Sequence, residues 1–279
     1  MKKIIITGVN GFVGKNLKSI LDLSRIETLG IDDEYFNSDD WRNTLLSILN
    51  KFKPSIIFHI GACSDTLETN VQYMMERNYE STKVISDWCE SHGSEMIYSS
   101  SAANYGITGT YPSNLYGWSK YVAEDYVIKN GGIALRYFNV YGPGEENKGR
   151  MSSFLFQSFL NSKNGRTNYL FPKSPKRDFV YVKDVVSANI FAHGNYSLLQ
   201  GSFYEVSTGV ATTFEEILDR FGLYYEYSDE AAIPIGYQFY TCGDKSKWMS
   251  GWKPQCLISE GISEYKTYLT SELLDHNLS

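Results

Sequence analysis

The stretch KIIITGVNGFVG, residues 3–14, decides the fold that we expect for this chain. Its first five residues are apolar and β-branched, which predicts a buried parallel strand, and residues 15–21 continue at helical period. Between them, Gly8 allows a tight turn, Gly11 lets a pyrophosphate approach the backbone, and Gly14 lets helix and strand pack closely. The helix N-terminus favours anions. This order predicts a dinucleotide-binding site, with a purely structural turn as the alternative.

The next strand, expected at residues 28–31, runs into Asp32 and Asp33. An acidic residue about 20 positions beyond the glycines is placed to meet the adenosine ribose hydroxyls of a dinucleotide. Two adjacent carboxylates repel a 2′-phosphate, and neither Lys nor Arg occurs between Asp32 and Trp41 to offset them. We therefore expect NAD as the cofactor, with NADP possible. The alternative for Asp33 is a solvated turn residue.

Strand and helix patterns continue to alternate along the chain. Further strands are expected at residues 55–60, 96–99, 132–137, 168–171 and 203–207, with a segment 176–184 that leads into a helix. Helices are expected at residues 41–52, 71–91, 114–129, 151–160, 185–193 and 214–221. This alternation predicts an α/β fold with a doubly wound parallel (Rossmann) sheet.

The domain division follows from where this alternation becomes less regular. We expect a dinucleotide-binding domain over residues 1–143, with returning segments from about 176–210. Residues 144–279 mainly form a smaller lobe. The tail is expected to be aromatic and irregular, with Tyr237, Trp248, Trp252 and Pro254.

Two segments near the middle of the chain carry the residues of a possible proton-transfer site. YSSSAANYG (residues 98–106) follows an expected strand, and YGWSK (residues 116–120) opens an expected helix. Tyr116 and Lys120, four residues apart, share a helical face. An ammonium group lowers the pKa of a nearby phenol, and a serine hydroxyl can hold the oxygen whose proton moves. The alternative is chance, because the chain contains 22 tyrosines.

Composition narrows the functional classes. The net charge of −6 and the pI of about 5.3 argue against a nucleic-acid partner. The longest apolar runs are strand-sized, so we expect no membrane span. The four cysteines and four histidines form no metal-ligand spacing, which predicts no metal and reduced thiols in a cytoplasmic protein.

Eight elements together resemble the extended short-chain dehydrogenase/reductase superfamily of sugar-nucleotide epimerases and dehydratases. They are TGVNGFVG, Asp32, HIGA (residues 59–62), Asn78, SSSAANYG, YGWSK, RYFNVYGP (136–143) and RDFVYVKD (177–184). Within the superfamily, four segments are similar to the ADP-glyceromanno-heptose 6-epimerases. These are GACSDT (61–66), YMMERNYE (73–80), RYFNVYGP followed by NKGRMSS (147–153), and LFPKSPKRDFVYV (170–182).

The resemblance implies roles for individual residues. Implied around the cofactor are Gly8, Asn10, Gly11, Phe12, Gly14, Asp32, Asp33, Ala62, Cys63, Ser64, Asn78, Tyr116, Lys120 and Val140. Implied in catalysis are Ser101, Tyr116, Lys120 and a second acid/base, Lys148. Implied near the nucleotide sugar are Ser101, Asn139, Phe171, Arg177 and Tyr237, together with Arg150 and Gln157. From the residues alone, a solvated surface lysine is the favoured interpretation of Lys148, and only the resemblance reverses it. Arg177 can equally pair with Asp178 or Asp184.

Three departures from the heptose enzymes bear on specificity. The segment between Asp32 and Trp41 is shorter, so the third strand and one wall of the adenine pocket are expected to be reduced. Ile60 stands where those enzymes carry a glutamate. Arg150 and Gln157 stand where they carry a serine and a histidine that contact the substrate.

The resemblance implies a nucleotide-sugar epimerase that oxidises and re-reduces its substrate with bound NAD(P). A 4-epimerase or a ketoreductase acting on a nucleotide sugar stays open. A 4,6-dehydratase is disfavoured because no acidic pair follows Ser101, and a non-catalytic dinucleotide-binding protein is the remote alternative. The implied assembly is a homodimer or higher homo-oligomer through helices 71–91 and 114–129.

Overall fold

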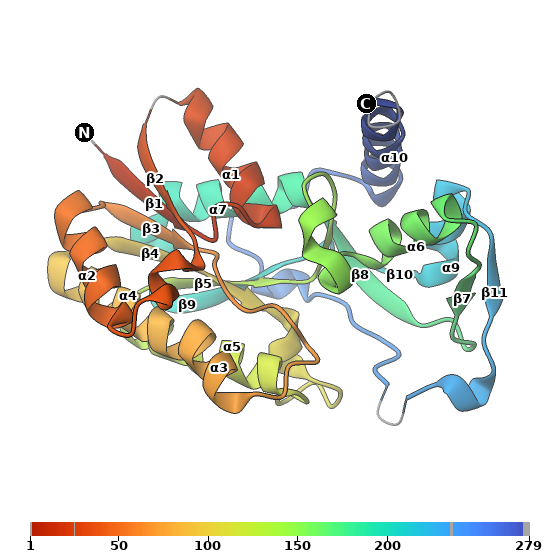
Figure 1. Cartoon of the computed structure of the whole chain (residues 1–279), viewed down its shortest axis with the longest axis horizontal. Helices are drawn as coiled ribbons and strands as arrows, with labels where there is room; N and C mark the ends of the chain where they lie inside the picture. Colours follow the sequence, from red (N-terminus) through yellow and green to blue (C-terminus); the bar gives the residue numbers. More distant parts are fainter. Residues whose placement is uncertain (1, 25, 235–236, 276–279) are drawn as a thin grey trace.

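The computed structural model describes residues 2–24, 26–234 and 237–275, and a six-stranded parallel sheet organises its larger part (Figure 1). The strand order is β2-β1-β3-β4-β5-β9. The strands are β1 Lys3–Thr7, β2 Glu27–Ile31, β3 Ile56–His59, β4 Glu95–Ser101, β5 Ile133–Tyr137 and β9 Ser202–Val206. Every neighbouring pair is parallel. The predicted doubly wound α/β fold is therefore confirmed.

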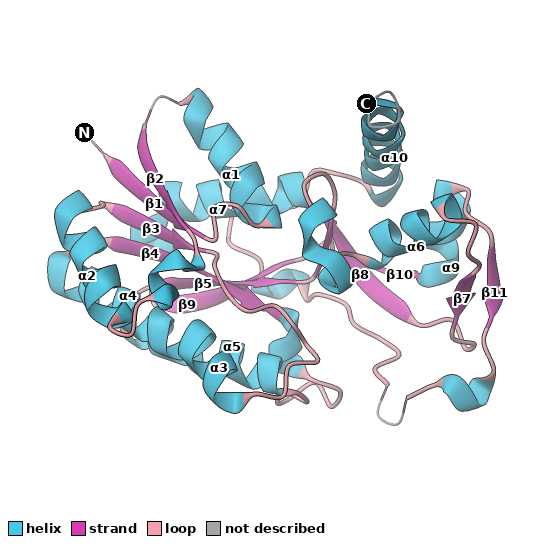
Figure 2. Cartoon of the chain, in the orientation of Figure 1, coloured by secondary structure: helices cyan, strands magenta, loops and turns pink. Residues whose placement is uncertain are grey.

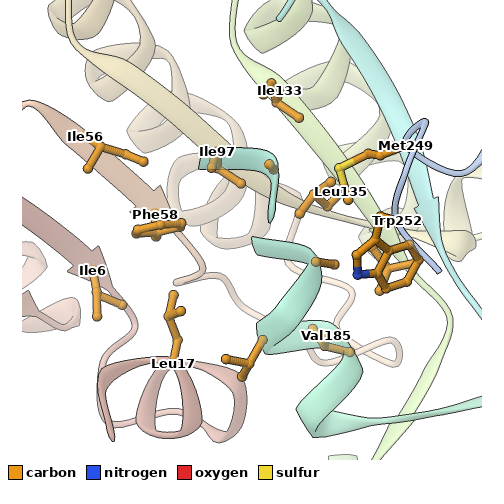
Figure 3. Packing of buried hydrophobic residues seen from close by; sticks show 14 of the residues in the cluster. Ile6, Leu17, Ile56, Phe58, Ile97, Ile133, Leu135, Val185, Met249 and Trp252 are labelled. Atoms are coloured by element: carbon orange, nitrogen blue, oxygen red, sulfur yellow. The ribbon is translucent and has the colours of Figure 1, made fainter. Parts of the chain in front are cut away.

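Helices cover both faces of this sheet (Figure 2), and its central strands β1 and β3 bury apolar side chains on both sides. Ile4 and Ile6 of β1 pack with α1 and α7, whereas Ile5 between them packs with α2, α4 and α5 on the opposite face. Figure 3 shows the packing on the face covered by α1 and α7, where Leu17 and Val185 approach the sheet. The helices are α1 Phe12–Leu23, α2 Trp41–Phe52, α4 Ser81–His92, α5 Leu115–Lys129 and α7 Val182–Gly194.

The expected shortening beyond β2 has a clear structural form. Residues Asp33–Asn37 make a 3₁₀ turn, η1, that leads into α2, and β2 ends the sheet order. Tyr35 of this turn is buried against Phe36 and Trp41. We expected a strand in this region to be reduced. The structure has the short aromatic turn η1 there.

The helix predicted over residues 71–91 is interrupted by a π-helical turn. The run consists of α3 Val71–Met75, the π turn η2 Glu76–Glu80 and then α4. Single π turns of this kind place one extra residue in a helix and often mark functional positions. Asn78, one of the predicted site residues, lies in the middle of it.

A second group of elements lies beside the main sheet (Figure 1). Strands β6 Asn139–Tyr141, β8 Lys176–Tyr181 and β10 Ala211–Thr213 form one small sheet, and β7 Asn168–Leu170 pairs with β11 Tyr225–Tyr227. Their helices are α6 Phe154–Lys163, α9 Phe214–Phe221 and α10 Ile258–Asp275, whereas the short α8 Tyr196–Leu199 packs against the main sheet. Because β6 precedes residue 143 and pairs with β8, this sheet takes strands from both sides of that residue.

Two sequence predictions are wrong in this region. The helix expected from residue 151 begins at Phe154, because the Ser153 hydroxyl caps it by accepting from the Phe156 N–H. The tail is not wholly irregular, since α10 is an 18-residue helix. Its buried side chains Ile262, Tyr265 and Leu269 pack against α9.

Candidate active site

A cavity of about 490 Å³ opens at the carboxyl ends of the parallel strands. It is lined by Thr7 at the end of β1, by Asp32 after β2 and by the last three residues of β4. Ligands of open α/β sheets bind at this edge. The predicted residues that line it are Gly8, Gly11, Phe12, Asp32, Asp33, Ala62, Cys63, Ser64, Ser101, Tyr116, Lys120, Val140 and Lys148. The structure therefore brings the predicted catalytic set and most of the predicted cofactor set together.

The glycine turn fits a dinucleotide pyrophosphate. Gly8 has a φ of +65°, and a Cβ there would lie 2.6 Å from the Gly61 Cα. A Cβ on Gly14 would lie 2.0 Å from the Gly8 carbonyl oxygen, so Gly14 serves the packing of α1 on the turn and is not part of the cavity lining. Gly11 is the N-cap of α1, and among the described residues no side chain caps this helix. The first N–H groups of α1 are thus left to an anion.

Asp32 fixes the glycine turn from the second strand. Its carboxylate accepts the Asn10 N–H at 3.2 Å. Asn10 itself is exposed and lies outside the cavity lining. Burial raises the pKa of Asp32, and the bond from Asn10 opposes this. Asp33 is not simply a solvated turn residue, because its Oδ2 accepts from the Arg77 guanidinium at 3.1 Å.

Tyr116 and Lys120 lie on α5 beside the end of β4. Asn114 caps this helix by accepting the Gly117 N–H at 2.8 Å, and the cap places Tyr116 in the first turn. Lys120 is 2 % exposed, with its Nζ 4.5 Å from the centre of the Tyr98 ring. Burial lowers the pKa of Lys120 to about 7, and the Glu124 carboxylate opposes this.

The expected lowering of the Tyr116 pKa by Lys120 is not found. Burial raises the pKa of Tyr116, and the group that opposes this is the Ser101 hydroxyl, through a hydrogen bond. Ser101 also accepts the Ala103 N–H at 3.1 Å, which holds its oxygen in place. The sequence argument counted the charge of Lys120 and left out the desolvation of the phenol, which has the larger effect here.

Asn78 supports the site from behind and is not part of the cavity lining. Its amide oxygen accepts the Cys63 N–H at 2.7 Å, and its amide nitrogen donates to the Cys63 carbonyl at 2.9 Å. The same nitrogen donates to the Ser119 hydroxyl at 2.9 Å. Asn78 therefore ties the loop after β3 to the turn of α5 between Tyr116 and Lys120.

A buried ion pair beneath the serine cluster was not predicted. Arg136 on β5 donates to Glu124 on α5 at 2.5 Å, and both side chains are buried. Glu124 also accepts from the Ser100 hydroxyl at 2.6 Å and from the Asn104 amide at 3.1 Å. Glu124 follows Lys120 by one helical turn, and this spacing was the signal in the sequence that a carboxylate lies near the site.

Lys148 enters the cavity from η4, the 3₁₀ segment Glu146–Met151. It is half-buried, with its Nζ 5.2 Å from the centre of the Phe12 ring, so it is not a fully solvated surface lysine. Burial lowers the pKa of Lys148, and the Glu145 carboxylate opposes this.

Six predicted substrate residues do not line this cavity, and three of them, Arg150, Gln157 and Asn139, have other surroundings. Arg150 pairs with Asp65, which lies in the loop after β3. The amide of Gln157 donates to the Arg150 and Ser152 carbonyls at 3.0 and 2.7 Å, so it holds the backbone of the Lys148 segment. Asn139 is exposed at the start of β6.

Phe171, Arg177 and Tyr237 form a separate cluster in the second group of elements. The rings of Phe171 and Tyr237 meet edge to face with centroids 4.9 Å apart, and the Arg177 Cζ lies 5.4 Å from the Tyr237 ring centre. Burial lowers the pKa of Arg177. The ion-pair alternative for Arg177 does not hold, because Asp178 accepts from Thr208, and Asp184 accepts from backbone N–H groups of residues 255 and 256.

Several lining residues escaped the sequence argument. They are Phe36, Tyr73, Arg77, Ser99, Ser100, Tyr137 and Phe138. Tyr137 accepts from the Ser99 hydroxyl at 2.9 Å and from the Asn189 amide at 2.7 Å. The spacing of Tyr73 and Arg77, four apart on an expected helix, was a usable signal for a contact between them.

Known proteins are similar to this chain in sequence and in fold. The sequence model of the NAD dependent epimerase/dehydratase family matches residues 4–206. The ADP-L-glycero-D-manno-heptose-6-epimerase of Brachyspira hyodysenteriae is 33 % identical over 316 residues, covering 95 % of this chain and 97 % of that protein.

Solved structures agree with this match. The ADP-L-glycero-D-manno-heptose-6-epimerase of Helicobacter pylori has a TM-score of 0.85 at 25 % identity, covering 97 % of this chain and 96 % of that one. A UDP-glucose 4-epimerase of Thermotoga maritima, solved with UDP-glucose, has a TM-score of 0.84 at 22 % identity, covering 97 % and 99 %. The chain belongs to the NAD dependent epimerase/dehydratase family.

Proposed function

We propose that the protein is a nucleotide-sugar epimerase that uses bound NAD, and that its substrate is an ADP-glyceromanno-heptose inverted at C6. One observation carries the proposal: Ser101, Tyr116, Lys120 and Lys148 line a single cavity that the glycine turn and Asp32 also line. The similarity to two heptose epimerases supports the choice of sugar. The residues proposed to hold the cofactor are those of the turn, Asp32 and Lys120.

Tyr116 is the base of the first half-reaction. It takes the proton of the sugar hydroxyl while the hydrogen on the same carbon leaves as hydride, so the alcohol becomes a carbonyl. The bound nicotinamide supplies the hydride acceptor, and afterwards the donor. Tyr116 accepts this proton as its phenolate, which the Lys120 ammonium stabilises, and Ser101, whose hydroxyl opposes the raised pKa of Tyr116, holds the substrate oxygen.

Lys148 serves the second half-reaction. When the carbonyl carbon takes the hydride back on its opposite face, its oxygen needs a proton from a different direction. Lys148 comes from η4, an element separate from α5, and burial lowers its pKa, which makes the ammonium a better proton donor. At an exocyclic carbon such as C6, two acid/base groups on two sides are what inversion requires.

The nucleotide is assigned to the cluster of Phe171, Arg177 and Tyr237. A guanidinium can grip diphosphate oxygens bidentately, and the two rings offer a surface for the base. On this assignment, residues 1–143 with the returning segments from about 176–210 bind the cofactor. Residues 144–279 mainly bind the nucleotide sugar.

A specific observation favours a second candidate, a nucleotide-sugar 4-epimerase. Arg150 is engaged by Asp65, and Gln157 is engaged by two carbonyls, so neither side chain is offered to a heptose as it stands. A ketoreductase on a nucleotide sugar uses the same cavity but consumes reduced cofactor at each turnover. The 4-epimerase and the ketoreductase differ in whether NADH is consumed.

We further propose a cytoplasmic homodimer formed through α3, α4 and α5. Among the described residues, no helix has the length and apolar character needed to cross a bilayer. On α5 the ring of Trp118, 44 % exposed, stacks on the exposed Tyr111 with centroids 6.2 Å apart. An aromatic pair of this kind is typical of an interface. A monomer mass in light scattering after size exclusion would disprove the dimer.

The deciding experiment is an NMR assay of purified protein, supplied with NAD, on ADP-D-glycero-D-manno-heptose. Appearance of the L-glycero epimer, lost in both Tyr116→Phe and Lys148→Ala, supports the proposal. If the heptose is unchanged and UDP-glucose epimerises, the second candidate replaces the first. If NADH is consumed stoichiometrically, the protein is a reductase. If every variant matches the wild type, the site is not catalytic.

A further inference from the structure

Arg77 brings a cation to the part of the cavity next to Asp32 and Asp33. Its side chain lies on the π turn η2, is 21 % exposed, and lines the cavity. Its Cζ lies 4.4 Å from the centre of the Phe36 ring and 4.6 Å from that of Tyr73. Both rings also line the cavity. A guanidinium held against two aromatic rings has little freedom to leave this position.

Asp33 engages this cation. Its Oδ2 accepts from the Arg77 Nη1 at 3.1 Å, although the two residues are 44 positions apart in the sequence. Asp33 is 77 % exposed at its side chain, so the pair itself contributes little to stability. The other cations among the described residues that line the cavity contact different rings: Lys120 lies over Tyr98, and Lys148 lies over Phe12.

The adenosine ribose meets the residues that follow the second strand in folds of this kind. An acidic residue there favours the free 2′-hydroxyl of NAD, whereas a nearby arginine accommodates the 2′-phosphate of NADP. This chain has both groups, bonded to each other. The choice between the two cofactors therefore depends on whether the guanidinium is held by Asp33 or is available to a phosphate.

We propose that Arg77 is the specificity-determining residue for the adenosine half of the cofactor, and that Asp33 keeps it in the NAD-selective arrangement by occupying its guanidinium. Removal of the Asp33 carboxylate then does two things. It removes a negative charge that repels the 2′-phosphate, and it releases a cation, already oriented by Phe36 and Tyr73, that attracts it. This inference concerns binding of the dinucleotide and does not depend on the sugar assigned above.

The test is a double-mutant cycle on the cofactor-free full chain. Dissociation constants for NAD⁺ and NADP⁺ are measured by isothermal titration calorimetry for the wild type, Asp33→Asn, Arg77→Gln and the double variant. The wild type should bind NAD⁺ more tightly. Asp33→Asn should shift the NADP⁺/NAD⁺ affinity ratio toward NADP⁺ by about tenfold or more, the size expected for a new charge-assisted contact. In the Arg77→Gln background, the same substitution should shift the ratio by less than about threefold.

Each alternative outcome overturns the proposal. If Asp33→Asn shifts the ratio equally in both backgrounds, the carboxylate acts by repulsion alone and Arg77 has no part in specificity. If the ratio does not move, or if the wild type prefers NADP⁺, Asp33 does not set the selectivity. Arg77→Lys with Asp33→Asn is the conservative variant, and it should keep part of the gain because the charge remains. Thermal unfolding of each variant reports whether it is folded, and NAD⁺ affinity reports whether the rest of the site is intact.

Discussion

The hydroxyl of Tyr265 donates to Oε1 of Glu145 at 2.8 Å, a bond between residues 120 positions apart. Tyr265 belongs to the C-terminal helix α10, and Glu145 is the fully buried residue that begins the segment carrying Lys148. Glu145 also accepts from the Ser153 hydroxyl at 2.7 Å. The last helix of the chain therefore fixes the position from which the proposed second acid/base reaches the cavity.

Tyr265→Phe should lower turnover while leaving NAD⁺ affinity within about twofold, because the lost bond acts on the Lys148 segment and not on the glycine turn. The free energy of unfolding should fall by about 1–2 kcal/mol, the usual loss when a buried acceptor loses its partner. Urea unfolding and steady-state assays measure the two effects. Thr267→Val, on the same helix with an exposed side chain, is the matched control. Equal turnover in both variants would show that α10 does not act on the site.

Tyr116→Phe should reduce kcat by about 10²–10⁴-fold, since it removes the group that accepts the proton. Its dissociation constant for NAD⁺ should change by less than about threefold, because the ring that lines the cavity remains. Tyr121→Phe, one turn further along α5, controls for loss of a phenol from this helix. A variant that loses cofactor binding together with activity would point to a structural role for Tyr116.

Lys120→Met should stabilise the cofactor-free protein at pH 7, and the stabilisation should shrink as the pH rises. The pKa of Lys120 is about 7 in the folded protein, against the ordinary 10.5. Between these values the unfolded chain binds more protons, so the free energy of unfolding rises with pH there. The cost of burying the ammonium is fully present below pH 7, at roughly 2–4 kcal/mol, and is relieved toward pH 10.5.

The measurement is the difference in Tm between Lys120→Met and the wild type at pH 7, 8, 9 and 10. Lys51→Met, at an exposed position in the last turn of α2, is the control and should show no such trend. A difference that stays constant across the range would mean that Lys120 remains protonated throughout.

Arg136→Met should destabilise the protein by about 3–5 kcal/mol, because it leaves the buried Glu124 carboxylate without its cation. The double variant with Glu124→Met should regain a large part of this loss, since neither charge then remains buried. Chemical denaturation of the three variants gives the values. If the single and double variants are equally unstable, the loss comes from packing against Phe203, over whose ring Arg136 lies, and not from the unpaired charge.

Contacts that are local in the sequence could be predicted. The glycine turn, the acidic residues after β2, and the pair Tyr116 and Lys120 depend on neighbours or on residues one helical turn apart, so spacing alone places them. The strand and helix alternation gave the sheet for the same reason. The pattern Ile262, Tyr265, Leu269 of α10 was also present, but the aromatic residues before it drew attention away from this helix.

Contacts between distant segments could not be predicted. The absence of Lys and Arg between Asp32 and Trp41 argued for NAD over NADP, yet α3 and η2 bring the Arg77 cation to Asp33 from elsewhere in the chain. Arg150 and Gln157 lie close to the expected region, but their side chains are taken by Asp65 and by backbone carbonyls. Sequence spacing indicates which residues lie near one another locally. The hydrogen-bond or ion-pair partner of each polar group depends on the packing of the whole fold.

The π turn at Glu76–Glu80 makes this helix sensitive to length, and no other helix among the described residues contains such a turn. It holds one residue more than an α-helical turn, so the loss of a single residue there would convert it to an ordinary α-helix. The helix on either side would keep its register, because the π turn is what takes up the extra residue. Asn78 would turn away from Cys63, or Arg77 from Asp33, because an ordinary α-helical turn could not present both side chains as they now lie. A deletion confined to these five residues would therefore disturb the site and leave the helix around it intact.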